Sequence, residues 1–82
     1  MEEKRATYSE TESIGLLLNL FKMYGLSIKK VGETIGVPPS TLYYIRSKNS
    51  ASQKTCFYIK TRLKECFPEI YEQIRASYNQ YF

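Results

Sequence analysis

Residues 28–45 read IKKVGETIGVPPSTLYYI, and this stretch constrains the fold of the chain more than any other. Val31 and Ile35 lie one helical turn apart, and Gly32 follows Val31 where a neighbouring helix would cross closely. A side chain larger than a methyl group at Gly32 would push two such helices apart. Gly36 can adopt a positive φ and reverse the chain within a few residues. The pattern predicts a helix-turn-helix, the unit that in DNA-binding proteins places its second helix in the major groove.

The positions of apolar, capping and helix-breaking residues predict an all-α bundle of about five helices, with the helix-turn-helix at the second and third. Ser27 and Ser52 are expected to cap the second and fourth helices, and Pro39 to begin the third. The first helix is expected to be capped by Thr11 or Ser13. The expected helices span residues 11 or 13 to 24, 28–35, 39 to 46 or 47, 53–66, and 68 onward. We interpret residues 1–9 as a flexible N-terminal arm and residues 10–82 as a single helix-turn-helix domain with a C-terminal aromatic helix.

The basic residues are concentrated in the middle of the chain. Nine of the 12 Lys and Arg residues lie between Lys22 and Lys64, where Glu33 is the only acid. This segment has a net charge of +8, whereas residues 1–21 and 65–82 each carry −2, within a total of +4. Such a distribution is expected when one side of a small domain binds nucleic acid. Taken alone, a solvated lysine-rich surface without a partner explains the charge equally well.

The composition argues against several classes of protein. The chain has no histidine, no aspartate and no Gly-rich phosphate loop, so we expect no catalytic residues and no enzyme activity. Cys56 and Cys66 are too far apart for a disulfide within one helix, and without histidine they do not predict a metal site. We expect two reduced thiols that pack as small apolar side chains, and no cofactor or small-molecule ligand. No apolar run approaches the roughly 20 residues that cross a membrane, and no signal peptide is recognisable, so we expect a cytoplasmic protein.

Residues 16–46 resemble the helix-turn-helix regulators of the lambda-repressor and Cro-like family. The matching residues are Gly25, Leu26 and Ser27 before the motif, Val31, Gly32, Ile35, Gly36 and Val37 within it, and Ser40, Thr41, Leu42 and Ile45 in the reading helix. The resemblance extends over the first four helices and reaches the fifth only by the number of helices. It implies a compact bundle and a sequence-specific regulator of transcription, often a dimer on a palindromic operator.

The resemblance also implies DNA contacts. Pro39, Ser40 and Tyr44 occupy positions where family members touch base edges, and Tyr43 lies beside them. Phosphate contacts are expected at Lys29, Lys30, Arg46, Lys48, Asn49 and Lys54. The alternatives are that a tyrosine tucks into the core and that the basic side chains only aid solubility.

Two positions depart from the family pattern. Ile28 stands where a polar, phosphate-binding residue such as Gln is often found, and Pro39 stands where a polar base reader is common. We therefore expect Tyr43, Tyr44 and Arg46 to supply more of the recognition.

The C-terminal segment contains more aromatic side chains than one small core is expected to absorb. An excess of this kind usually indicates a partner surface. It predicts a homodimer interface formed by Phe67, Tyr71, Ile74, Tyr78 and Tyr81. The competing interpretation is that these side chains close the end of the bundle.

The combined prediction is a small repressor that binds double-stranded operator DNA by inserting its third helix into the major groove. The alternative is a protein-interaction module on the same scaffold, acting as an antirepressor or as an inhibitor of a nucleic-acid machine. A third possibility is architectural DNA binding without sequence preference. Lys60, Arg62 and Lys64 on the fourth helix either extend the basic surface or only solvate the side away from the core.

Overall fold

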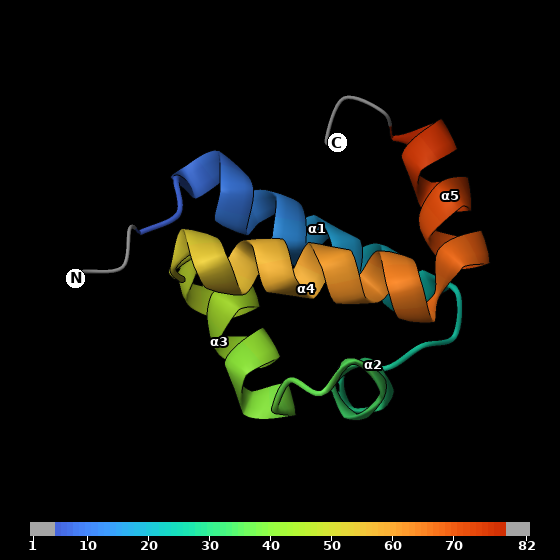
Figure 1. The fold of residues 1–82 in the computed structure, drawn as a ribbon, viewed down its shortest axis with the longest axis horizontal. Helices are drawn as coiled ribbons and strands as arrows, with labels where there is room; N and C mark the ends of the chain where they lie inside the picture. The colour runs from blue at the N-terminus through green and yellow to red at the C-terminus, as the bar shows by residue number, and fades with distance from the viewer. Residues whose placement is uncertain (1–4, 79–82) are drawn as a thin grey trace.

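The computed structural model describes residues 5–78, which form five helices and no strand. The helices are α1 (Tyr8–Met23), α2 (Ile28–Ile35), α3 (Pro39–Lys48), α4 (Gln53–Cys66) and α5 (Pro68–Ser77). Helices α1 and α4 lie alongside each other, α2 and α3 lie below this pair, and α5 stands at its end (Figure 1). The predicted all-α bundle is confirmed, and α2 has the predicted bounds.

Helix α1 begins earlier than predicted. Its N-cap is Thr7, whose hydroxyl accepts from the backbone N–H of Glu10 at 3.2 Å while the Glu10 carboxylate accepts from the Thr7 backbone at 3.4 Å. This reciprocal pair is a capping box. The predicted caps at Thr11 or Ser13 are wrong, because both residues lie inside the helix and are buried. The Thr11 hydroxyl lies 3.1 Å from the Asn49 carbonyl oxygen, to which it donates, and so links α1 to the end of α3.

The residues before α1 pair with the connection between α3 and α4. The Ala6 backbone N–H donates to the Ala51 carbonyl at 2.8 Å, and Arg5 forms an isolated antiparallel bridge with Ser52. The Arg5 guanidinium also donates to the Ser50 hydroxyl. Residues 5–7 of the predicted arm are therefore attached to the bundle by backbone pairing, while residues 1–4 lie outside the described residues.

The turn between α2 and α3 follows the sequence prediction. The Ser27 hydroxyl caps α2 by accepting from the Lys30 backbone at 3.2 Å, and Gly36 ends the helix with φ 79°. Pro39 is the first residue of α3, where its missing N–H leaves no bond unmade. A Cβ atom at Gly32 would lie 2.6 Å from the Val37 carbonyl oxygen. The approach is closer than expected, since even a methyl group does not fit.

The hydrophobic core takes side chains from all five helices. Its fully buried apolar members are Ile14, Leu17, Leu18, Phe21, Val31, Ile35, Leu42, Ile45, Ile59, Leu63 and Ile74. Burial of this apolar surface is the main force that holds five short helices together.

Within the described part of the C-terminal segment, two aromatic side chains contribute to this core, Phe67 and Tyr71. Tyr71 is 8% exposed and Ile74 is fully buried, while the Phe67 ring packs edge-on against Phe21 with centroids 5.4 Å apart. Their assignment to a dimer interface is therefore corrected for Tyr71 and Ile74, which close the end of the bundle. Tyr78 is exposed, and Tyr81 lies outside the described residues.

Candidate nucleic-acid interface

Helix α3 presents one polar and aromatic face to solvent. Leu42 and Ile45 are buried against the bundle, so Tyr43 and Tyr44, which lie between them, point outward. Tyr43 is 49% exposed and Tyr44 is 55% exposed. The structure thus places Ser40, Tyr43 and Tyr44 on the outside of α3. A tyrosine in this setting offers a hydroxyl for hydrogen bonding and a ring edge for apolar contact.

Pro39 is the exception among the four expected base-contacting residues. It is half-buried, because its ring and backbone nitrogen lie against Gly32 of α2. Pro39 therefore has a structural role, because it begins α3 and packs against α2.

The expected phosphate-contacting residues fall into two groups. Lys29, Lys30, Lys48 and Lys54 are exposed. Asn49 is half-buried with φ 51°, and its carbonyl accepts from Thr11. Its backbone ends α3 in the left-handed conformation that asparagine tolerates.

Arg46 is held by its neighbours. Its guanidinium lies 3.4 Å from Asn19 Oδ1, to which it donates, and its Cζ lies 5.3 Å from the centroid of the Tyr43 ring. Arg46 is half-buried rather than extended into solvent.

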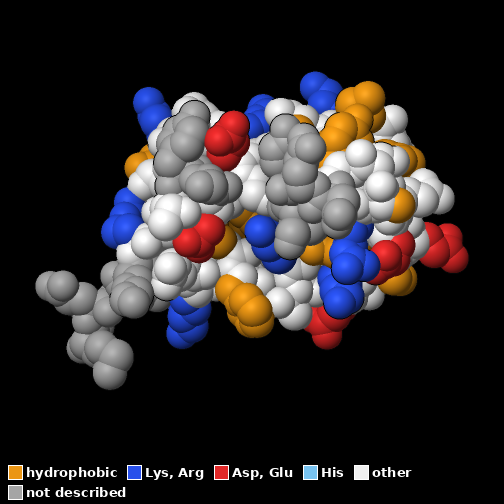
Figure 2. Space-filling model, turned by 90° about the horizontal axis from the view of Figure 1, so that it is seen from above, with side chains coloured by type: hydrophobic (Ala, Val, Ile, Leu, Met, Phe, Trp, Pro, Cys, Tyr) orange, Lys and Arg blue, Asp and Glu red, His pale blue; other side chains and the backbone are white. Residues whose placement is uncertain are grey.

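The charges around α3 differ from those elsewhere on the molecule. The sequence of α3 contains two basic residues and no acid. On the opposite face, seen from above, Lys, Arg and Glu side chains occur together with apolar side chains between them (Figure 2). Within the sequences of α2 and α3 Glu33 is the only acid, so these two helices themselves would repel a polyanion little.

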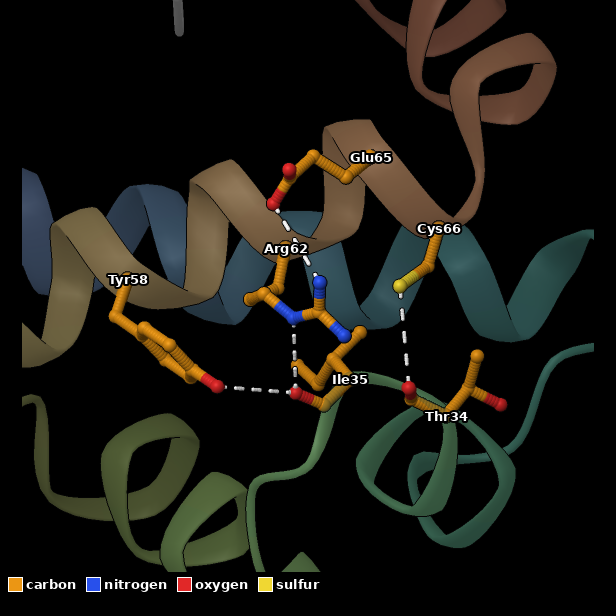
Figure 3. A network of polar contacts seen from close by, with 6 residues as sticks. All are labelled: Thr34, Ile35, Tyr58, Arg62, Glu65 and Cys66. Carbon is orange, nitrogen blue, oxygen red and sulfur yellow. Dashed lines mark hydrogen bonds and ion pairs between the residues drawn. The ribbon is translucent and has the colours of Figure 1, made fainter.

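A set of contacts not predicted from the sequence holds the end of α2. The Ile35 carbonyl accepts from Arg62 Nε at 3.3 Å and from the Tyr58 hydroxyl at 3.5 Å (Figure 3). The Cys66 thiol lies 3.8 Å from the Thr34 carbonyl oxygen, to which it donates. The last carbonyls of a helix have no donor within it, so side chains of α4 supply these bonds.

Arg62, left open between a basic surface and simple solvation, therefore caps α2. It also lies 3.5 Å from Glu65 in an ion pair on α4. The signal for this contact was present in the spacing of Tyr58, Arg62 and Cys66, which recur every four residues on one face of a helix. That spacing alone does not reveal which helix end they meet.

The outer face of α4 also carries exposed aromatic side chains. Phe57 is 73% exposed, and with Tyr58, Lys54, Thr55 and Thr61 it lines a shallow apolar hollow. Lys54 was expected to contact phosphate, whereas no role was predicted from the sequence for Phe57.

Both cysteines are free, as predicted. Cys56 is buried, and burial raises the pKa of its thiol, which favours the neutral form. Cys66 is half-buried and contacts the end of α2. Among residues 5–78, no helix has the length and apolar character needed to cross a membrane.

Comparison of the chain with models of protein families, with curated proteins and with solved structures found no match. The resemblance to lambda-repressor and Cro-like regulators therefore stays a prediction that rests on the residues of the chain itself.

Proposed function

We propose that this protein is a sequence-specific DNA-binding regulator of transcription, a small repressor that acts in the cytoplasm without a cofactor. The observation that carries the proposal is the solvent-facing surface of α3, where Ser40, Tyr43 and Tyr44 point outward from a helix anchored by Leu42 and Ile45. A ten-residue helix with such a face fits the DNA major groove, in which side chains read base edges.

Basic residues on α2 and α3 support the proposal. Lys29 and Lys30 lie in the first turn of α2, where a positive charge is unfavourable because it adds to the positive end of the helix dipole. A phosphate bound there would offset this cost. Lys48 lies in the last turn of α3. Contacts with phosphates position the protein on the duplex, and base contacts then provide specificity.

Repression would be steric, because a protein that occupies an operator excludes other proteins from it. Each phosphate contact releases counterions, so the affinity for DNA should fall steeply as salt increases. Within residues 5–78 no separate sensor domain is present. Control would then come from protein concentration or from a protein partner.

We also predict, separately from DNA binding, that the protein forms a homodimer. Of the five residues first assigned to a homodimer interface, Tyr78 is the one that is exposed within the described part of the chain. Sedimentation at tens of micromolar without DNA measures the association directly. A monomeric protein would contradict the predicted dimer but would not contradict the proposed regulation of transcription.

The test of the function is selection of binding sites from a library of random duplex DNA. We expect an enriched motif, and we expect Tyr44→Ala to lose the preference for it while remaining folded. A palindrome would indicate a dimer, and its half-site spacing would report the distance between two α3 helices. Recovery of no motif at low salt by folded protein would overturn the proposal. Salt-dependent binding without any preference would instead indicate an architectural DNA-binding protein.

A second candidate function is protein binding through α4, and the exposure of Phe57 at 73% favours it. In this case the bundle would act as an antirepressor or as an inhibitor of a nucleic-acid machine. Phe57→Ala and Lys48→Ala distinguish the two functions in a reporter assay built on the selected operator. Loss of activity in Lys48→Ala with full activity in Phe57→Ala supports DNA binding, and the reverse pattern supports protein binding.

A further inference from the structure

We infer that Arg46 is a positioning residue, which fixes the Tyr43 ring on the reading face of α3, rather than a phosphate contact. The inference rests on the proposed function of α3, because Tyr43 must read DNA for its orientation to matter. From its basic character alone, Arg46 was expected to contact phosphate.

The contacts of Arg46 run along its whole length. A Cβ atom placed on Gly15 would lie 3.7 Å from Arg46 Cγ and 3.8 Å from Arg46 Cα, so the aliphatic stem lies against α1. One turn further along α1, Asn19 Oδ1 accepts from the guanidinium at 3.4 Å. The Cζ atom is 5.3 Å from the centroid of the Tyr43 ring. Helix α1 therefore holds Arg46, and Arg46 in turn contacts Tyr43.

This arrangement restricts the orientation of the half-exposed Tyr43 ring. Tyr43 is 49% exposed and precedes Arg46 by three residues, so the two side chains share one side of α3. A guanidinium within about 6 Å of an aromatic centroid is attracted to the ring face. A ring already held in one orientation loses less conformational entropy when it contacts a base.

The charges near Arg46 disfavour a phosphate at the same place. A hollow between α1 and α3 is lined by Glu12, Asn19, Arg46 and Asn49, together with Gly15 and Leu16. The Glu12 carboxylate repels an anion that would approach Arg46 from this side. Lys48 is exposed, does not line this hollow and, within the part of the chain that the structure describes, forms no ion pair. Lys48 is therefore the matched control for a phosphate contact.

The experiment compares Arg46→Gln with Lys48→Gln on the selected duplex and on a scrambled duplex. Fluorescence anisotropy measures both affinities over a range of salt concentrations. Lys48→Gln is expected to weaken binding to both duplexes alike. It should also reduce by about one the magnitude of the salt slope, the slope of the logarithm of affinity against the logarithm of salt concentration. Arg46→Gln is expected to leave the slope unchanged and to lower the preference for the selected duplex about two- to fivefold, the effect of an exposed cation–π contact.

A double-mutant cycle assigns the effect to the ring. In a Tyr43→Ala background, Arg46→Gln should cause no further loss of preference, because the ring that it positions is absent. If Arg46→Gln instead lowers the salt slope as Lys48→Gln does and leaves the preference unchanged, Arg46 binds phosphate and the inference is overturned.

Nuclear magnetic resonance of the free protein separates this inference from the proposed function. We expect ring-current shifts of the Arg46 side-chain protons that disappear in Tyr43→Leu. Their absence in the wild-type protein overturns the positioning role even if DNA binding is specific. Their presence in a protein that prefers no DNA sequence overturns the proposed function, and with it the role of Arg46 in recognition.

Discussion

Replacing Gly32 by alanine tests how closely α2 approaches the turn and α3. A Cβ atom built on Gly32 lies 2.6 Å from the Val37 carbonyl oxygen and 3.2 Å from Pro39 Cγ. One neighbour is backbone and the other is a rigid ring, so the methyl group fits only if the turn moves. Overpacking of this kind costs about 3 kcal/mol at the upper end of its usual range. The higher helix propensity of alanine relative to glycine offsets about 1 kcal/mol of this cost.

The expected net effect of Gly32→Ala is a loss of about 2 kcal/mol in the free energy of unfolding. In a domain of this size that loss corresponds to a Tm lower by about 8–16 °C. Thermal unfolding followed by far-ultraviolet circular dichroism measures it, with urea denaturation as an independent check. A variant that melts at or above the temperature of the wild-type protein would refute the steric reasoning.

Gly15→Ala is the matched control, since Gly15 is also a buried helical glycine. Its added Cβ would meet Arg46 Cγ at 3.7 Å and Cα at 3.8 Å, which is ordinary van der Waals contact. The gain in helix propensity should then raise the free energy of unfolding by up to about 1 kcal/mol. The two substitutions have the same chemistry and opposite expected signs. Equal destabilisation by both would show that the close contact at Gly32 does not explain the result.

Thr7→Ala removes the side-chain cap of α1 and is expected to lower the free energy of unfolding by about 1 kcal/mol, and an unchanged urea midpoint would contradict this. Arg62→Met keeps the stem but removes the donor to the end of α2, so we expect a loss of about 1 kcal/mol. The exposed control Lys64→Met should change stability by less than about 0.5 kcal/mol, and equal effects in urea denaturation would argue against the cap. In the native state a disulfide reagent should modify Cys66 before Cys56, because Cys56 is buried and its raised pKa leaves less thiolate; simultaneous modification would contradict this. The folded-state pKa of Cys56 lies above the ordinary value of 9.0, so its contribution to stability is present below that pH and is lost as pH rises further. Urea denaturation at alkaline pH should therefore show a smaller decline in Cys56→Ala, and an identical decline would exclude this group as a cause.

The helix-turn-helix could be predicted because its signals are local. Ser27 and Ser52 cap the helices that follow them, and Gly36 has the left-handed conformation that its place after a helix suggests. Each depends on backbone groups within a few residues. The start of α1 was misplaced because Thr7, Thr11 and Ser13 are all capable of capping a helix, and the burial that distinguishes them depends on contacts with distant parts of the chain.

The fate of the aromatic side chains could not be predicted from local pattern. Tyr71 and Phe67 have the composition of an interface, yet Tyr71 is buried within the chain and Phe67, which precedes α5, packs against Phe21 of α1. Conversely, Phe57 lies on a helix with an evident apolar face but points away from it. Composition shows how much aromatic surface a chain contains, and only the tertiary packing decides which part of it remains exposed.

In the candidate interface too, some features follow from local sequence spacing and others depend on tertiary packing. Leu42 and Ile45 fix which side of α3 faces inward, so the exposure of Tyr43 and Tyr44 could be predicted from spacing. The contact of Arg46 with Asn19 joins residues 27 positions apart in the chain. It depends on α1 crossing α3, which no local pattern reveals.

The turn between α2 and α3 is held from two directions by unrelated contacts. Gly32 allows the Val37 carbonyl and Pro39 to approach α2, and Arg62 binds the Ile35 carbonyl from α4. Neither contact requires a ligand, so the orientation of α3 relative to the bundle is fixed in the free protein. A surface fixed in this way loses less conformational entropy on binding than one that must be ordered. Under the proposed function, substitutions that loosen the turn should therefore weaken DNA binding without changing the exposed face of α3. Substitutions on that face should weaken binding without changing stability.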